Sequence, residues 1–350
     1  MDTNITNRIK KRLLMISTDR KIFEVGSAVR ARQTEYAKNY DEVHIIVFAK
    51  GKHETQNEIV ITSNCWAYST QSLSRWLYAF DALRLAKFIV AKRSITDITC
   101  QDPFQTASVG VSLKKQFPLI QLELQVHTDI GSPHFTYTWG NKIRKTLALS
   151  YLPKADHIRV VSNKIKKYLI EILKIEDSKI EVRPVAVDTS KIKNAPIIPS
   201  ADLHAKYPQF EKIVLMASRI EKEKNFELAI KSFAEVVKKI PKAGLIIVGE
   251  GSQVPMINNQ CSKLGLNNFA VKSVIFESWA DQQTLYSYYK TADVFLVTSL
   301  FEGYGMTLVE AHAAACKIVS TDVGVAREID AIIVRDDPQS VSEGVIGIIS

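Results

Sequence analysis

The sequence predicts an α/β protein with two doubly wound domains, each a mostly parallel sheet covered by helices. Apolar runs of strand length alternate with longer segments of helical period along most of the chain. The alternation weakens between residues 190 and 208 and then restarts. A chain of 350 residues is also long for one domain, which typically takes about 100–200 residues. We therefore expect one domain over residues 1–190 and a second over residues 191–350.

Strands and helices of the first half follow from these runs. A strand at Arg12–Ser17 precedes a helix over about Ser27–Asn39 and a strand at His44–Phe48. The stretch Leu73–Val90 places apolar residues at helical spacing. Further predicted strands are Ile95–Cys100, Ile120–Val126, His157–Val161 and Ile180–Val182.

The second half repeats the pattern after a break. Residues 190–208 hold three prolines and few periodic apolar positions, and this predicts an interdomain connection. The predicted strands are Ile213–Ala217, Leu245–Val248, Val271–Phe276, Asp293–Val297 and Lys317–Ser320, with helices at Phe226–Val237 and Met306–Ala315. Two such sheets facing each other create a cleft along their carboxyl edges, where ligands bind in this architecture.

Composition narrows the class of protein. Four widely spaced cysteines favour neither a structural zinc site nor a disulfide framework, and we expect no metal. No apolar run approaches the roughly 18 residues needed to span a bilayer. The polar N-terminus lacks the apolar core of a signal peptide, so a cytoplasmic chain is expected. The net charge of +9 fits nucleic acid, an anionic membrane or an anionic small substrate. No nucleic-acid-binding motif accompanies this charge, so an anionic membrane or an anionic small substrate remains as its partner.

The first chemical signal is the segment Ser299–Ala311. A strand runs into a loop containing Gly303 and Gly305 and then into a helix, whose first amides form an anion site. Glu302 and Glu310 can face the same cleft. Carboxylates repel phosphate but accept hydrogen bonds from hydroxyls, so a nucleotide sugar fits the pair. A plain crossover with solvated glutamates is the alternative.

The second signal is the segment Ala217–Asn225. Arg219 directly follows a strand, Lys224 lies just before a helix, and Asn225 is a plausible N-cap. Arg219 offers a fork that matches phosphate oxygens and Lys224 a point charge, so together they could hold a diphosphate leaving group. An ordinary charged loop is the competing interpretation.

These segments, with Gly249–Gly251, Ala292–Ser299 and Thr321–Glu328, together resemble glycosyltransferase family 4 over about residues 212–330. The N-terminal half is similar more loosely, through Gly26, His127 and Val182–Asp188. The resemblance implies a GT-B fold and metal-independent, retaining transfer from a UDP- or GDP-linked sugar, without a cofactor.

The resemblance also implies roles for individual residues. Arg219 and Lys224 would bind the diphosphate, Glu302 the sugar hydroxyls and Glu310 the ribose hydroxyls. His127 would approach the donor sugar, although a satisfied core histidine is the alternative, and Gly26 would lie near the diphosphate. The other donor-binding residues would be Gly249 and the backbone of Gly303, Tyr304, Gly305, Met306 and Thr307.

The chain departs from the family pattern at several positions. Glu277-Ser278-Trp279 stands where a glycine is common, Thr298 replaces the usual proline, and Gly26 replaces a glycine pair. The family usually has more C-terminal helix beyond the position of Ser350, so truncation there is expected.

The acceptor is not encoded in a motif. Aromatic residues mixed with cations over residues 73–93 predict either a crossover helix or a basic amphipathic helix on a membrane. The second interpretation favours a lipid-linked acceptor, as in polysaccharide or glycoconjugate biosynthesis, and the first leaves any glycan open. Two other functions compete on the same architecture, a nucleotide-sugar epimerase and a non-catalytic partner subunit.

Overall fold

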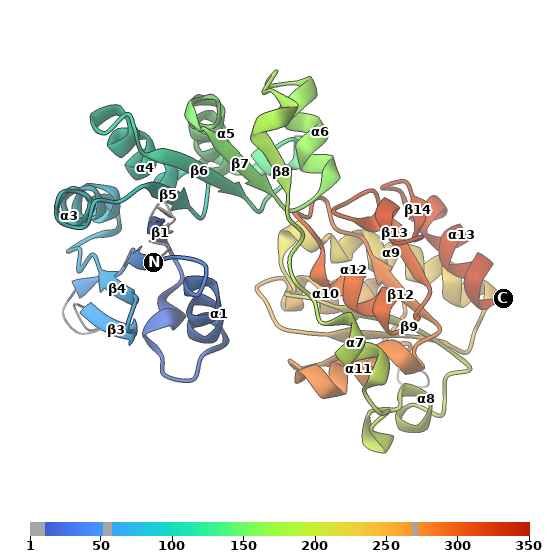
Figure 1. Cartoon of the computed structure of the whole chain (residues 1–350). Coiled ribbons are helices and arrows are strands. Elements are labelled where there is room, and N and C mark those ends of the chain that lie inside the picture. Colours follow the sequence, from blue (N-terminus) through green and yellow to red (C-terminus); the bar gives the residue numbers. More distant parts are fainter. Residues whose placement is uncertain (1–10, 52–57, 268–271) are drawn as a thin grey trace, which may run out of the picture. The chain divides into compact units, whose positions relative to one another are not determined.

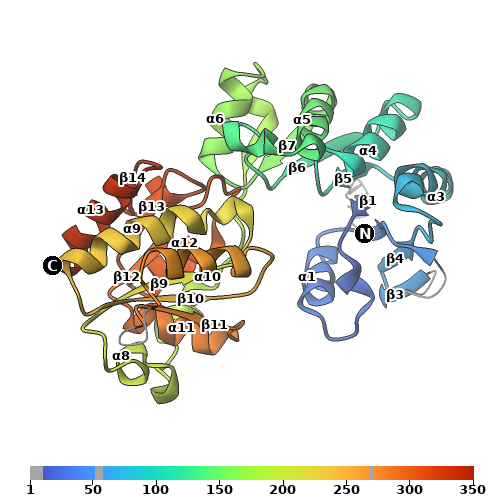
Figure 2. The same cartoon turned by 180° about the vertical axis from the view of Figure 1, so that it is seen from behind.

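The computed structural model describes residues 11–51, 58–267 and 272–350. Contacts divide the chain into two compact units (Figures 1 and 2). The first comprises Met1–His127, Thr136–Val160 and Ile165–Arg183, and the second comprises Thr128–Phe135, Val161–Lys164 and Pro184–Ser350. The polar N-terminal segment and Val271, which was predicted to begin a strand, lie outside the described residues.

The first unit contains an eight-stranded sheet in the order β3-β4-β2-β1-β5-β6-β7-β8. Every pairing is parallel except that of β3 with β4. The strands are β1 (Arg12–Ser17), β2 (Glu42–Val47), β3 (Glu58–Thr62), β4 (Cys65–Ser69), β5 (Asp97–Cys100), β6 (Gln121–Val126), β7 (His157–Val160) and β8 (Ile180–Val182). The predicted strands of this half are thus present, and β3 and β4 extend the sheet beyond them.

Helices cover both faces of this sheet because its central strands are buried runs on both sides. The α-helices are α1 (Ala28–Ala37), α3 (Tyr78–Arg93), α4 (Gln105–Gln116), α5 (Trp139–Tyr151) and α6 (Asn163–Glu171). Ser27 starts α1 by accepting a hydrogen bond from the amide of Arg30, and Thr138 starts α5 in the same way from Asn141. The helices α3, α4 and α5 follow one another on one face, with α4 packed against both neighbours (Figure 1).

The second unit contains a fully parallel six-stranded sheet in the order β11-β10-β9-β12-β13-β14. Its strands are β9 (Lys212–Ala217), β10 (Ala243–Val248), β11 (Val274–Glu277), β12 (Val294–Val297), β13 (Ile318–Thr321) and β14 (Ile332–Val334). The α-helices are α7 (Thr189–Asn194), α8 (Leu203–Lys206), α9 (Phe226–Lys239), α10 (Val254–Lys263), α11 (Gln282–Thr291), α12 (Met306–Ala313) and α13 (Pro338–Ile349). Two doubly wound, Rossmann-like domains are therefore confirmed.

The segment predicted as an interdomain connection has a different role. It carries α7 and α8, and Ile192 and Leu203 are buried in the core beneath α11 and α12. The prolines break the segment into helices too short to show a hydrophobic period, so the sequence pattern hid their apolar contacts.

Candidate functional site

The predicted chemical residues of the second half lie at the carboxyl ends of neighbouring strands. Ser218 follows β9, Gly249 follows β10, and Thr298 follows β12. Since β9 pairs with both β10 and β12, these three strand ends share one edge of the sheet. This is the edge at which open α/β sheets bind ligands.

An ion pair between Lys224 and Glu302 forms the centre of the site. The Lys224 ammonium contacts Oε1 of Glu302, and the Ser299 hydroxyl donates a hydrogen bond of 2.8 Å to the same oxygen. The two charged side chains are only 14% and 17% exposed. A carboxylate held in this way by two donors keeps its second oxygen available for another donor. The structure therefore brings together the two residues that the sequence assigned to phosphate and to sugar hydroxyls.

Thr298 fixes the backbone that carries Lys224. Its buried hydroxyl lies 3.0 Å from the carbonyl oxygen of Lys224 and 3.1 Å from that of Asn225, and it donates to this pair of acceptors. Nearby, the amide of Leu300 donates to the carbonyl of Glu223 at 2.8 Å. The strand end and the lysine loop are thus joined through the main chain. In the sequence Thr298 is only a departure from the usual proline, and no pattern predicts this contact.

The predicted cap of α9 is wrong in its chemistry. Asn225 occupies the N-cap position, but its backbone is left-handed, with φ of 49°, and its side chain does not cap the helix. The amide nitrogen Nδ2 of Asn225 donates to Asp336 instead, at 3.1 Å. An asparagine tolerates the left-handed region better than most residues, which accounts for its presence at this bend.

The glycine-rich loop leads directly into α12. Gly305 is its N-cap with φ of 85°, and a Cβ there would lie 2.8 Å from Leu308. Thr307, in the first turn of the helix, lines a small hollow that it shares with Lys224, Glu302 and Ser218. The amides of Met306 and Thr307 precede the first intrahelical hydrogen bonds and carry the positive end of the helix dipole. The hollow therefore brings a cation and a carboxylate beside the first turn of α12.

A turn after β13 supports the loop of Glu302. The Thr321 hydroxyl donates a hydrogen bond of 2.7 Å to the carbonyl oxygen of Ser299. The amide of Val325 donates one of 3.0 Å to the carbonyl oxygen of Tyr304. Gly324 has φ of 51°, and a Cβ there would lie 2.2 Å from the Tyr304 carbonyl oxygen. Only glycine allows this approach, so the turn and the loop of Glu302 are packed backbone against backbone.

Two earlier segments of the chain also belong to the second unit, and they contact the loop of Glu302 and the turn after β13. The ring of Phe135 packs edge-on against Phe301, with centroids 5.8 Å apart. Lys164 pairs with Asp129 at 4.0 Å and with Asp322 at 3.8 Å. No sequence pattern predicts these contacts, because they join positions far apart in the chain.

Arg219 and Glu310 make their contacts away from the central pair. Arg219 is 65% exposed and forms an ion pair with Glu223 at 2.9 Å. Glu310 is buried in α12 and accepts a hydrogen bond of 3.2 Å from the hydroxyl of Tyr289. Burial raises the pKa of Glu310, and burial beside this carboxyl raises the pKa of Tyr289. Their predicted roles with a donor stay predictions.

Gly249 owes its place to a close approach within the protein. Its φ is 139°, and a Cβ there would lie 2.0 Å from the carbonyl oxygen of Ser218. Its amide donates to the carbonyl of Glu277 at 3.0 Å. Glycine is therefore needed to bring the ends of β9, β10 and β11 together, and its amide is already engaged.

Gly26 and His127 belong to the first unit. Gly26 is exposed between β1 and α1, with φ of 81°, so the turn requires a left-handed residue. His127 follows β6 and is exposed, which removes the alternative of a core histidine. Its Nε2 lies 3.0 Å from Oε1 of Gln125, an oxygen that also accepts a hydrogen bond from Arg159 at 2.9 Å. The surrounding protein, and then the charge of Arg159, lower the pKa of His127, and this favours the neutral ring at pH 7.

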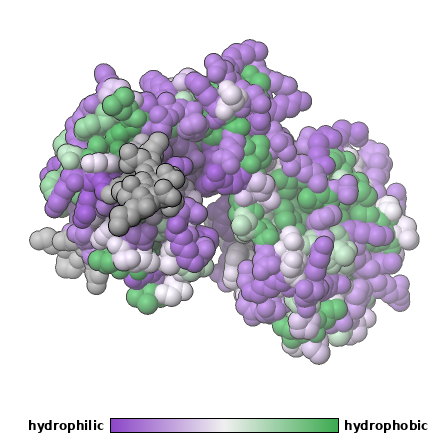
Figure 3. All heavy atoms as spheres, in the orientation of Figure 1, coloured by the Kyte–Doolittle hydropathy of each residue, from purple (hydrophilic) through white to green (hydrophobic). Residues whose placement is uncertain are grey.

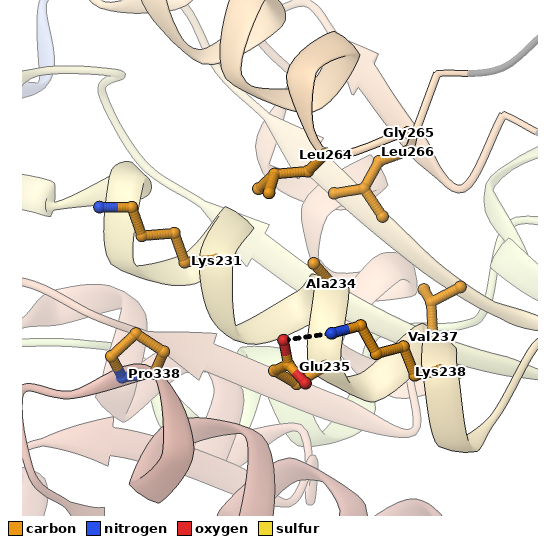
Figure 4. A pocket seen from close by; sticks show the side chains of 9 residues that line it. All are labelled: Lys231, Ala234, Glu235, Val237, Lys238, Leu264, Gly265, Leu266 and Pro338. Atoms are coloured by element: carbon orange, nitrogen blue, oxygen red, sulfur yellow. Dashed lines mark hydrogen bonds and ion pairs between the residues drawn. The ribbon is translucent and has the colours of Figure 1, made fainter.

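Another hollow of the second unit lies apart from these residues. Its volume is about 530 Å³, and it lies between α9, the turn after α10 and Pro338 (Figure 4). Two of its charged residues, Glu235 and Lys238, pair with each other at 2.7 Å. None of the predicted site residues lines it.

No group of three or more His, Cys, Asp or Glu side chains in residues 11–51, 58–267 and 272–350 is placed to hold a metal ion. Within the same ranges, no helix combines the length and the apolar character that crossing a bilayer requires.

Two family models match the chain in sequence. The model described as Glycosyltransferase Family 4 matches residues 29–191, and the one described as Glycosyl transferases group 1 matches residues 203–332. The second match contains Arg219, Lys224, Glu302 and Glu310.

Curated relatives and solved structures agree with these matches. An uncharacterised glycosyltransferase of Methanocaldococcus jannaschii is 26% identical over 72% of this chain and 66% of its own. Alpha-monoglucosyldiacylglycerol synthase of Streptococcus pneumoniae is 27% identical over 69% of this chain and 55% of its own. The chain thus spans between about half and two thirds of the length of these relatives. HepE of Anabaena, solved with UDP and glucose, superposes with a TM-score of 0.69 at 18% identity, covering 97% of this chain and 90% of its own.

Proposed function

Since the chain belongs to glycosyltransferase family 4 and has the GT-B fold, we propose that it transfers a sugar from a nucleotide diphosphate donor, UDP- or GDP-linked, to a glycan or lipid-linked acceptor with retention of configuration. The observation that carries the proposal is the Lys224–Glu302 pair beside the start of α12. It places a cation for phosphate next to a carboxylate for hydroxyls.

In the proposed reaction the bond between the anomeric carbon and the β-phosphate oxygen breaks. The acceptor hydroxyl attacks from the face that the phosphate leaves and passes its proton to that phosphate. Lys224 and the amides of Met306 and Thr307 stabilise the charge that develops on the leaving group. No metal or cofactor takes part in the proposal.

The remaining predicted residues complete this proposal. Glu302 orients the sugar hydroxyls. Glu310 accepts hydrogen bonds from the ribose hydroxyls on Oε1, because Tyr289 donates to Oε2. Arg219 leaves its ion pair with Glu223 and binds the diphosphate instead, and its exposed side chain is free to make this change. Neutral His127 contacts the donor sugar as a hydrogen-bonding partner without a charge.

The acceptor is proposed by likeness. The Streptococcus pneumoniae relative is named alpha-monoglucosyldiacylglycerol synthase, and the product in this name is a glucosylated diacylglycerol lipid. We therefore place the reaction in glycoconjugate or polysaccharide biosynthesis, at the cytoplasmic surface of a membrane. The net charge of +9 favours such a surface.

A thermal-shift screen with UDP, GDP, ADP and their sugar conjugates tests the donor site. A ligand that binds only the folded state raises the melting temperature. We expect a rise with one nucleotide family, lost in Lys224→Ala and kept in Lys231→Ala, a control on α9 outside the site. No rise with any nucleotide diphosphate in folded protein would contradict the donor site and favour a partner subunit.

Product analysis separates transfer from the alternative reaction. Incubation of the bound nucleotide sugar with lipid or glycan acceptors should give a new glycoside and free nucleotide diphosphate. Conversion of the donor into an isomeric nucleotide sugar without any acceptor would show an epimerase instead.

A further inference from the structure

One helix layer of the first unit carries an apolar face that none of the described residues covers. The inner side of α3 packs on the sheet through Tyr78, Ala82, Ala86 and Ile89, all buried. This confirms a crossover helix, the first of the two interpretations of the segment. The outer side of α3 and of the preceding turn at Arg75–Leu77 remains exposed.

Large apolar side chains are concentrated on that outer side. Trp76 is 92% exposed, Phe80 is 66% exposed and Phe88 is 61% exposed, and Leu73 just before them is 89% exposed. Exposed single apolar residues are common in proteins, but four within 16 residues form a cluster that needs an explanation.

Cations share this face with the aromatic rings. Phe80, Arg84 and Lys87 follow one another at spacings of four and three residues, which places them on one stripe of α3. Trp76 lies four residues before Phe80, in the turn that leads into the helix. Residues 73–93 contain five cations and one acidic residue, Asp81, which pairs with Arg84 at 3.8 Å. The exposed apolar surface is therefore embedded in net positive charge.

The same layer repeats the pattern on α5. Trp139 is 75% exposed and Ile143 is 44% exposed, and Lys142 and Arg144 lie between and beside them. Since α4 packs against both α3 and α5, the exposed apolar residues of α3 and those of α5 belong to one row of helices. Figure 3 shows hydrophobic residues among hydrophilic ones at the upper left, where Figure 1 draws α3 and α4.

We propose that the outer face of α3, with Trp76, Phe80, Arg84 and Lys87 at its centre, binds the surface of an anionic membrane. Aromatic rings insert at the headgroup level while Arg and Lys contact lipid phosphates. A second copy of the chain fits this face less well, because it would bring the same cations against each other. The proposal deepens the membrane location given under the proposed function by naming the surface that binds, and its test needs no donor.

Sedimentation with lipid vesicles tests the charge contribution. We expect the protein to bind vesicles of phosphatidylcholine mixed with phosphatidylglycerol far better than vesicles of phosphatidylcholine alone. Arg84→Gln/Lys87→Gln should weaken binding to the mixed vesicles about tenfold or more, since each cation near an anionic surface contributes measurably. Lys231→Gln/Lys238→Gln on α9 removes the same charge and should bind like the unchanged protein.

A second pair of variants tests the apolar contribution. Trp76→Ala/Phe80→Ala should also lose about tenfold in binding to the mixed vesicles. Leu119→Ala, which removes an apolar side chain that is 95% exposed, should not. Circular dichroism checks folding, and the nucleotide thermal shift should be the same in all variants, so the outcome is independent of the donor site.

Three outcomes would overturn the proposal. These are the absence of vesicle binding, equal binding by the Arg84→Gln/Lys87→Gln variant and its charge-matched control, and a dimer in solution that Trp76→Ala/Phe80→Ala dissolves. The last would identify the face as a contact between copies of the chain.

Discussion

At the scale of single residues, the site depends on an ion pair whose members are mostly shielded from water. Lys224 and Glu302 each neutralise the charge of the other. An unpaired charge with so little exposure to water would destabilise the fold. The pair therefore stabilises the fold and also holds both groups in position for a ligand.

Removing one partner should separate these two roles. We expect Lys224→Met to lower the free energy of unfolding by about 1–3 kcal/mol, because Glu302 keeps its charge without a counterion. Activity with the identified donor should fall by about 100-fold or more, since a preorganised charge at the leaving group is lost.

Glu302→Gln is the matched variant for that pair. In the double variant the loss of stability should be smaller than the sum of the two single losses, because the charges no longer need each other. Activity should not recover. Additive stability losses in urea titrations would show that the pair contributes nothing as a pair.

Gly324 leaves no room for a side chain beside the loop of Glu302. We expect Gly324→Ala to destabilise the protein by about 1–3 kcal/mol, since an alanine at φ of 51° is strained and its Cβ meets the Tyr304 carbonyl. The displaced loop of Glu302 should also raise KM for the donor.

Gly347→Ala is the control, because a Cβ there meets nothing within 4 Å. Gly347 lies inside α13, where alanine favours the helix by about 1 kcal/mol. If thermal melts showed the same change in stability for both substitutions, Gly324 would not be needed for the packing of the turn against the loop of Glu302.

At the scale of elements, strand ends and loops are joined by few but specific hydrogen bonds. Thr298→Val keeps the shape of the buried side chain and removes the donor that serves the carbonyls of Lys224 and Asn225. We expect a loss of about 1–3 kcal/mol, the cost of leaving buried acceptors unpaired. Thr284→Val at the exposed start of α11 is the control.

The kinetic effect of Thr298→Val indicates what the bond does. If the hydroxyl positions Lys224, KM for the donor rises more than kcat falls, because phosphate binding is weakened first. Unchanged kinetic constants beside reduced stability would limit Thr298 to the fold.

The sequence was sufficient for elements with strong local signals. The strands β1, β9, β10 and β12 are continuous buried runs, and their predicted positions agree with the structure within two residues. The strand β3 was missed because its apolar run, residues 59–61, is short, and because its side chains stay partly exposed at the sheet edge.

The site was predictable to a similar extent. Lys224 and Glu302 lie 78 residues apart, yet each follows a strand of the same parallel sheet, so topology alone brings them to one edge. The role of Thr298, the pairing of Arg219 with Glu223 and the approach of Phe135 to Phe301 depend on side-chain packing, which no local pattern encodes.

At the scale of the whole molecule, a buried histidine links folding to pH. His44 on β2 is fully buried, stacks on Trp66 and contacts the Tyr68 hydroxyl at 3.0 Å and Glu42 at 3.2 Å. Burial lowers its pKa below the usual value, more than the nearby Glu42 raises it. The folded protein therefore keeps His44 neutral at a pH at which the unfolded chain binds a proton.

This difference fixes the sign of the pH dependence. His44 contributes its full stability above the unfolded pKa of about 6.5 and loses it as pH falls below that value, because the unfolded chain then binds more protons. The loss from this one group at pH 5.5 is at most about 1.4 kcal/mol.

His44→Gln, which cannot titrate, should lose less stability between pH 7.5 and 5.5 than the unchanged protein in urea titrations. His312→Gln at an exposed position of α12 should keep the original dependence. An identical slope for His44→Gln and the unchanged protein would assign the acid sensitivity to other groups, since the burial of His44 would then carry no proton linkage.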